Sequence, residues 1–144
     1  MARFQTVIKK ARFSYSGISP QQMQSIAQVL ADDIRSRILR AEDAFDNPAP
    51  TLKNGNKGKG YQTYKARRNP PAIRNWQYTG RTLRSLKVLQ ANQNRALIGF
   101  TDPHSNMVAA VNNRRWRQFG VSPRNRRTLI EAYRNTRRLS VVAA

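Results

Sequence analysis

The clearest pattern in the chain is a stripe of apolar residues at helical spacing, which begins just after Ser19-Pro20. A serine cap followed by proline at the first helical position favours a helix start at this point. Apolar residues then recur at steps of three or four, so they share one face of an α-helix. They are Met23, Ile26, Leu30, Ile34, Ile38, Ala41 and Phe45. The residue before a proline resists helical backbone, so the helix is predicted to end near Asn47-Pro48, about 39 Å from its start.

Residues 76–100 show a different pattern, which predicts a helical turn followed by a β-hairpin. Leu83 and Leu86 lie three residues apart and therefore share one face of a helical turn. The residues that follow predict strands at 87–91 and 95–100. An Asn-Gln-Asn segment joins them, and asparagine tolerates the left-handed backbone of short hairpin turns. Four basic residues and no acid lie in this stretch, so the hairpin is predicted to carry a basic rim.

Two more helix starts follow the hairpin. Asp102-Pro103 is predicted to open a short helix over 105–113, and Ser122-Pro123 is predicted to open a last helix that ends near Arg137. The residues between these helices, 114–120, are predicted as a strand or an ordered loop.

The remaining segments have no clear period. Residues 1–17 are predicted as a strand or an extended arm, and residues 139–144 as a short apolar tail that could add a strand to this sheet or to a neighbour's. Residues 47–74 hold four of the seven prolines and three of the seven glycines, so they are predicted as a long loop. This loop leaves room for one helical turn at 61–68.

Together these elements predict an α+β fold in a single domain over residues 18–138. A long N-terminal amphipathic helix packs on a small antiparallel β-sheet, with further short helices and the long basic loop at 47–74. The sheet is expected to cover most of the apolar helix face. The alternative is that part of this face packs on a neighbouring copy of the chain.

Charge adds a prediction about partners. The 144 residues include 27 Lys or Arg and 7 Asp or Glu, which gives a formal net charge of +20. Such a balance makes nucleic acid or another polyanion the expected partner, although the surplus could also serve only to keep the protein in solution. Five of the seven acids fall within 32–46, whereas residues 47–101 contain eleven basic residues and no acid.

The long loop and the segment before the last helix are the predicted contact regions for phosphates or for an acidic surface. Tyr61 and Tyr64 lie among the basic residues of the loop. The residues predicted to face DNA or a protein partner are Lys53, Lys57, Lys59, Lys65, Arg67, Arg68, Arg74, Arg114, Arg115 and Arg117. The alternative for the loop is a solvated segment with no binding role.

No pattern in the sequence predicts a catalytic, cofactor or metal site. The chain has no cysteine, and its one histidine, His104, lies beside Asp102 in the chain, whereas a catalytic relay needs groups aimed from different elements. The Gly55–Gly60 run has the outer spacing of a P-loop, but Tyr61 stands where that motif requires lysine. We therefore expect no enzymatic activity, no cofactor and no metal. Since no run approaches about 20 apolar residues, no membrane span is expected either.

Two short motifs follow the long first helix in a recognisable order. The first reads Thr-Gly-Arg-Thr-Leu-Arg-Ser-Leu-Lys-Val, and the second is a Phe-Gly-Val-Ser turn that opens the last helix. Their key residues are Thr79, Gly80, Arg81, Leu83, Ser85, Leu86, Phe119, Gly120 and Ser122. This order resembles the virion morphogenesis family of tailed bacteriophages, which includes neck and tail-completion proteins. The likeness spans roughly residues 18–136 and departs from the family at 111–116, where an aromatic, His and Gly cluster is often found.

The resemblance implies a structural protein of the phage head–tail junction, acting in the neck, in tail completion or as a tail terminator. It implies a homo-oligomeric ring of six or twelve copies around the DNA channel, assembled in the host cytoplasm and carried in the virion. The implied partners are other neck, portal or tail proteins and the genomic DNA in the lumen. The alternative, which follows from charge alone, is a small basic nucleic-acid-binding protein without a virion role.

Overall fold

The computed structural model describes residues 18–49, 65–67, 76 and 80–142. Its named elements are α1 (Pro20–Leu39), α3 (Arg81–Ser85), β1 (Leu86–Ala91), β2 (Ala96–Phe100), α4 (Pro103–Trp116) and α5 (Pro123–Val142). The predicted N-terminal arm, the Gly-rich run and most of the predicted loop lie outside the described residues. The architecture is α+β, with a long N-terminal helix and a two-stranded antiparallel sheet, as predicted.

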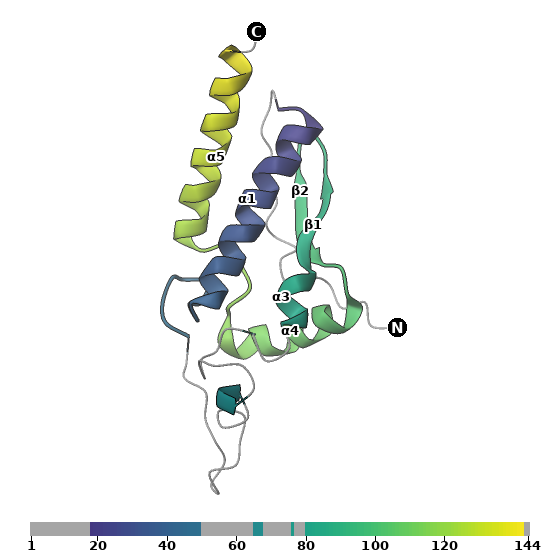
Figure 1. Ribbon diagram of the computed structural model, residues 1–144, viewed down its shortest axis with the longest axis vertical. Coiled ribbons are helices and arrows are strands. Elements are labelled where there is room, and N and C mark those ends of the chain that lie inside the picture. Colours follow the sequence, from purple (N-terminus) through teal and green to yellow (C-terminus); the bar gives the residue numbers. More distant parts are fainter. Residues whose placement is uncertain (1–17, 50–64, 68–75, 77–79, 143–144) are drawn as a thin grey trace, which may run out of the picture.

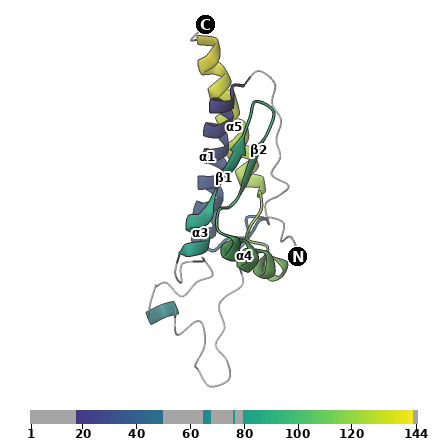
Figure 2. The same ribbon diagram turned by 90° about the vertical axis from the view of Figure 1, so that its right-hand side faces the viewer.

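Helix α1 is the central element of the described fold. It lies between α5 on one side and the β1–β2 hairpin on the other (Figure 1), while α3 and α4 lie together at the open end of the hairpin (Figure 2). The predicted apolar face from Met23 to Ile38 is buried along its whole length, with each of its five predicted members no more than 1% exposed. The prediction that this face packs on a sheet is confirmed, and α5 covers it as well.

The start of α1 is where the sequence places it. The Ser19 hydroxyl accepts a hydrogen bond from the Gln22 backbone N–H at 3.2 Å, and the Gln22 side chain accepts one from the Ser19 N–H at 2.9 Å. This reciprocal capping box satisfies two of the backbone donors that a helix start leaves without partners.

The predicted end of α1 near Asn47-Pro48 is wrong, because the helix stops eight residues earlier at Leu39. Ala41 takes a left-handed backbone with φ 57°, and the N–H groups of Ala41 and Glu42 bond back to the carbonyls of Ile38 and Arg37. This is a Schellman termination, which usually carries glycine at the left-handed position. Because alanine stands at this position, the sequence gives no sign that the helix ends here. The helical spacing of apolar residues continues to Phe45, although Phe45 lies outside the helix and is 56% exposed.

The predicted hairpin is confirmed to within one residue at each strand end. β1 and β2 pair antiparallel, with Leu86 opposite Phe100 and Ala91 opposite Ala96. A bulge between Val88 and Gln90 shifts the register. In the turn, the Asn92 side-chain oxygen accepts hydrogen bonds from two backbone N–H groups of the following residues, both at 2.9 Å. An asparagine side chain that folds the backbone in this way favours a tight connection.

Both later helices start as predicted and run longer than predicted. α4 continues through 114–116, so the strand or ordered loop expected there is wrong, and it ends where Arg117 adopts a left-handed φ of 46°. α5 continues past Arg137 to Val142, so the apolar tail is helical up to that residue and adds no strand. The reason is that neither glycine nor proline occurs between Arg124 and Val142 to stop the helix.

Candidate polyanion-binding surface

Most acidic side chains of this protein form ion pairs with arginines of the same chain. All seven acids lie among the described residues. Four arginines form ion pairs with four of them: Arg35 with Asp32 at 2.8 Å, Arg40 with Glu42 at 3.2 Å, Arg81 with Asp102 at 2.7 Å, and Arg124 with both Glu42 at 3.4 Å and Asp46 at 3.6 Å. The negative charge is therefore used to hold the fold together.

A larger set of basic residues has no such counterion. Eleven of them are exposed and form no ion pair within the part of the chain that the structure describes. They are Arg67, Arg84, Lys87, Arg95, Arg114, Arg115, Arg117, Arg126, Arg127, Arg134 and Arg137. Exposed cations without an intramolecular counterion are available to contact phosphates or an acidic surface.

The basic residues predicted from sequence are distributed unevenly in the structure. Arg114, Arg115 and Arg117 are brought together at the end of α4, where the Arg115 guanidinium lies 5.8 Å from the centre of the Trp116 ring. Arg67 is exposed as well. Lys65 lies in a helical turn over residues 65–67 and its side chain is buried, against the prediction that it faces DNA or a partner. Burial lowers the pKa of its amine. The other predicted residues lie outside the described ranges, namely Lys53, Lys57, Lys59, Arg68 and Arg74.

Four of the exposed arginines lie on α5 and are absent from the residues predicted from sequence. They are Arg126, Arg127, Arg134 and Arg137. Helical spacing could have identified them, because their positions do not fall on the inner face of the helix. That face carries Asn125, Leu129, Ala132 and Thr136.

The first motif forms the junction between α3 and the hairpin. Gly80 caps α3 with a left-handed φ of 70°, a backbone conformation that glycine adopts without strain. Leu83 and Leu86 are both buried, but only Leu83 lies on the predicted helical turn, since Leu86 is the first residue of β1. The buried Ser85 hydroxyl donates to the Thr82 carbonyl at 2.8 Å. Arg81 holds the start of α4 through a bidentate contact with Asp102 at 2.7 and 3.1 Å. Thr79 lies outside the described residues.

The second motif forms the junction between α4 and α5. The Phe119 ring packs edge-on against both Trp76 and Phe100, with centroids 4.8 and 5.1 Å apart. The Asn113 side chain bonds both the N–H and the carbonyl of Phe119. The Ser122 hydroxyl accepts from the Asn125 N–H, and the Asn125 side chain accepts from the Ser122 N–H, both at 3.1 Å, which caps α5.

Arg37 of α1 ties the end of α1 to the junction between α4 and α5, and the sequence did not single it out. Its side chain is 1% exposed and donates to the carbonyls of Gln118 at 2.9 Å and Gly120 at 2.8 Å. It also donates to the Asn125 side chain at 3.1 Å and to the Glu42 carbonyl at 3.3 Å. Burial lowers the pKa of Arg37, and the surrounding acids, Asp46 first among them, oppose that shift. The residues of both motifs that the structure describes thus have structural roles.

Asp102 provides a test of the first junction through pH. Hydrogen bonds from Arg81 and Ser105 hold the pKa of Asp102 far below its ordinary value. The ionised carboxylate therefore stabilises the fold above the unfolded-state pKa near 4, and this contribution is lost as the pH falls toward the folded-state pKa. Replacing Asp102 by Asn keeps an oxygen that can cap α4 and removes the ion pair.

We expect Asp102→Asn to lower the melting temperature at pH 7, with the difference from the wild type shrinking below about pH 4. Thermal unfolding followed by circular dichroism between about pH 7 and pH 2 measures this difference. The control is Asp32→Asn, which removes an exposed ion pair within α1 and should change the melting temperature little. The prediction would be contradicted if the difference in melting temperature between Asp102→Asn and the wild type stayed constant over this pH range.

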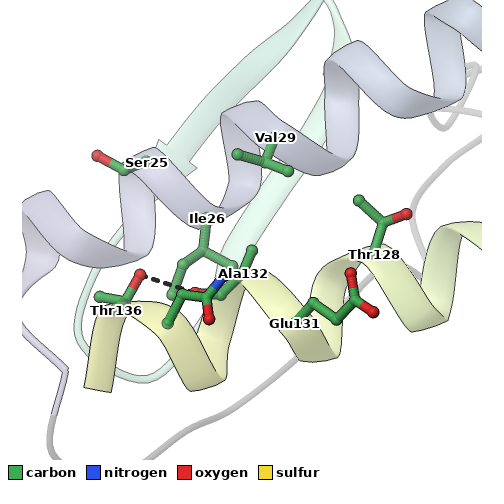
Figure 3. Close-up of a pocket in the computed structure, with 8 residues that line it drawn as sticks. Ser25, Ile26, Val29, Thr128, Glu131, Ala132 and Thr136 are labelled. Atoms are coloured by element: carbon green, nitrogen blue, oxygen red, sulfur yellow. Dashed lines mark hydrogen bonds between the residues drawn. The ribbon is translucent and has the colours of Figure 1, made fainter. Parts of the chain in front are cut away.

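A groove lies between α1 and α5. Its volume is about 380 Å³, and it is open along its length. Figure 3 shows Val29 of α1 across from Glu131 and Thr128 of α5, and Ser25 across from Thr136, with Ile26 and Ala132 between the helices. Glu131 is its only charged residue. No basic residue of the described ranges lines the groove, so it is separate from the exposed basic residues described above.

The described residues hold no arrangement that suggests chemistry. His104 is exposed in the first turn of α4, where its backbone N–H, rather than its ring, bonds Asp102 at 3.2 Å. Within the described ranges, no group of three metal-binding side chains lies close enough to hold an ion. Among the same residues, no helix is both long and apolar enough to span a bilayer.

Comparisons of the chain with models of protein families, with curated proteins and with solved structures found no significant match in any of the three.

Proposed function

We propose that this protein is a structural subunit of the head–tail junction of a tailed bacteriophage, which assembles as a homo-oligomeric ring around the DNA channel. It works without enzymatic activity, and its partners are neighbouring rings of the neck, portal or tail and the genome in the lumen. The motif order of the sequence suggests this role. The observation that carries it furthest is the set of eleven exposed basic residues without counterions among the described residues.

A passive DNA channel needs positive surface without sequence readout. Lys and Arg contacts to phosphates position nucleic acid and carry no sequence information, so a surface of this kind suits any genome that must pass. The acids of the chain are mostly paired within the subunit and are thereby kept from repelling the DNA.

The sheet supports assembly with other copies. β1 and β2 pair only with each other among the described residues, so each strand has one edge without a partner there. A hairpin alone is marginally stable, and an open edge is a template for a strand from another chain. A ring in which one copy contributes an extended segment to the sheet of the next would use these edges.

Electron microscopy of the purified protein, together with peptide mass spectrometry of virions from the phage that encodes it, tests the proposal. We expect closed rings in micrographs and peptides of this chain in the virion. A protein that stays monomeric and is missing from purified virions would overturn the proposal.

That outcome would favour the rival function, a small basic nucleic-acid-binding protein without a virion role, which the arginines of α5 would serve equally well. The rival predicts tight binding of nucleic acid by the monomer, with an affinity that falls steeply as salt increases.

A further inference from the structure

We propose that the outer face of α5 is the surface of this protein that contacts the phosphate backbone of duplex DNA. The residues that make the contact are Arg126, Arg127, Arg134 and Arg137, named here the α5 arginine stripe. The inference takes DNA as the polyanion from the proposed function. It moves the main contact away from the loop and the α4 end that the sequence predicts.

The stripe lies on one face of α5, where Ile130, which is 41% exposed, separates Arg126 and Arg127 from Arg134 and Arg137. With 3.6 residues per turn, its four positions fall within about 100° of the helix circumference, away from the buried positions of Asn125 and Leu129. Glu131 lies outside this arc, on the side of the groove between α1 and α5. From Arg126 to Arg137 the stripe extends about 16 Å along the axis, which exceeds the roughly 12 Å width of the DNA major groove. It is therefore long enough to reach phosphates on both sides of that groove.

The arginines of the stripe are not engaged elsewhere in the described chain. Arg124, at the start of the same helix, shows the contrast, because it pairs with Glu42 and Asp46 and its backbone N–H bonds Asp46 at 2.9 Å. Among the described residues, no acid forms such an ion pair with an arginine of the stripe. Guanidinium groups that are exposed and unpaired bind phosphate oxygens through two parallel N–H donors.

DNA fits the stripe better than a second copy of this chain does. A homotypic contact would need an acidic face, and the acids of the chain are mostly engaged by Arg35, Arg40, Arg81 and Arg124. Glu131, on α5 itself, is the one exposed acid without an ion pair among the described residues. Four unpaired arginines facing a single carboxylate are poorly matched in charge, whereas duplex DNA supplies a negative charge about every 1.7 Å along its axis.

The test compares two variants that lose the same amount of charge. The stripe variant carries Arg126→Gln, Arg127→Gln, Arg134→Gln and Arg137→Gln. The control variant carries Arg84→Gln, Lys87→Gln, Arg95→Gln and Arg114→Gln, which are also exposed, also lack ion pairs among the described residues and lie off α5. Circular dichroism and thermal melting first establish that both variants fold like the wild type. Fluorescence anisotropy then measures their affinity for a short labelled duplex between about 50 and 200 mM salt.

We expect the stripe variant to bind duplex at least tenfold more weakly than the wild type, with a salt slope that is lower by about 3 to 4, because each lost phosphate contact removes about 0.9. The control variant removes four other exposed cations of the same protein, so it should also lose some affinity, but its salt slope should fall clearly less than that of the stripe variant. Equal losses in both variants would overturn the inference, because they would show that overall charge alone governs binding. A second result would also overturn the inference: the wild type binds no duplex, and the stripe variant no longer forms the oligomer that the wild type forms. That result would assign the stripe to an acidic protein partner.

These outcomes are separable from the proposed function. A stripe variant that loses DNA binding supports the inference even if virions lack the protein. Rings found at the head–tail junction, combined with a stripe variant that binds DNA like the wild type, would support the proposed function and refute the inference.

Discussion

Replacing Arg37 by methionine should lower the free energy of unfolding by about 3 to 5 kcal/mol. The guanidinium donates to three backbone carbonyls and to the Asn125 side chain, and it is 1% exposed. Methionine fills part of the space but donates nothing, so buried acceptors are left without partners at about 1 to 3 kcal/mol each. Since domains of this size are stable by only about 5 to 15 kcal/mol, the variant should be close to unfolding at room temperature.

Urea denaturation followed by circular dichroism measures this effect, with Arg40→Met as the matched control. Arg40 lies three residues further along the chain, its side chain is 50% exposed, and its side-chain contacts are with Glu42. Exposed ion pairs are worth roughly 0 to 1 kcal/mol, so this control should retain nearly full stability. Similar losses for the two variants would contradict the role assigned to Arg37.

Replacing Leu83 by aspartate should prevent the domain from folding. Leu83 is 1% exposed and lies in the core that α1, α3 and the hairpin share. The substitution removes a buried aliphatic side chain, which alone costs about 2 to 5 kcal/mol. It also places a charged carboxylate in this apolar core. The guanidinium of Arg35, which donates to the Leu83 carbonyl at 3.2 Å, already forms an ion pair with Asp32. The two effects together approach the total stability of a small domain.

Far-UV circular dichroism and size-exclusion chromatography detect this loss, and Leu89→Asp is the control. Leu89 lies on β1, six residues after Leu83, and is 40% exposed, so a carboxylate there stays in water and should cost less than about 1 kcal/mol. A Leu83→Asp protein with normal helix content and a normal melting temperature would refute the placement of the helical turn in the core.

The helix starts were predictable because their signals are local. Ser19, Asp102 and Ser122 each precede a proline, and each caps the helix that follows through its own side chain. A cap and a proline act on backbone groups within three residues of themselves, so no distant contact is needed to set the start. The hairpin was predictable for the same reason, since Asn92 folds its own turn.

The candidate surface was only partly predictable. The sequence can indicate regions dense in basic residues. In this way it indicated Arg67 and the three arginines at the end of α4, all of which are exposed. It misjudged Lys65, because a residue's charge does not say whether the fold buries it. The α5 arginine stripe was missed because Arg126 and Arg137 are eleven residues apart and become neighbours on one face only when the helix between them is known to be unbroken.

The sequence by itself determined the fold class, the three helix starts, the hairpin and the excess of positive charge, because each depends on composition or on residues close together in the chain. Only the tertiary structure decided where α1 ends and what the Phe119–Ser122 turn does. Ala41 holds a left-handed conformation without the usual glycine, next to a segment that is fixed by contacts from Arg37 and by the bond from the Ala44 N–H to the Arg117 carbonyl at 2.8 Å. The Ala44–Arg117 bond and the Arg37–Gln118 bond each join residues more than seventy positions apart in the chain, so a pattern of neighbouring residues cannot reveal them.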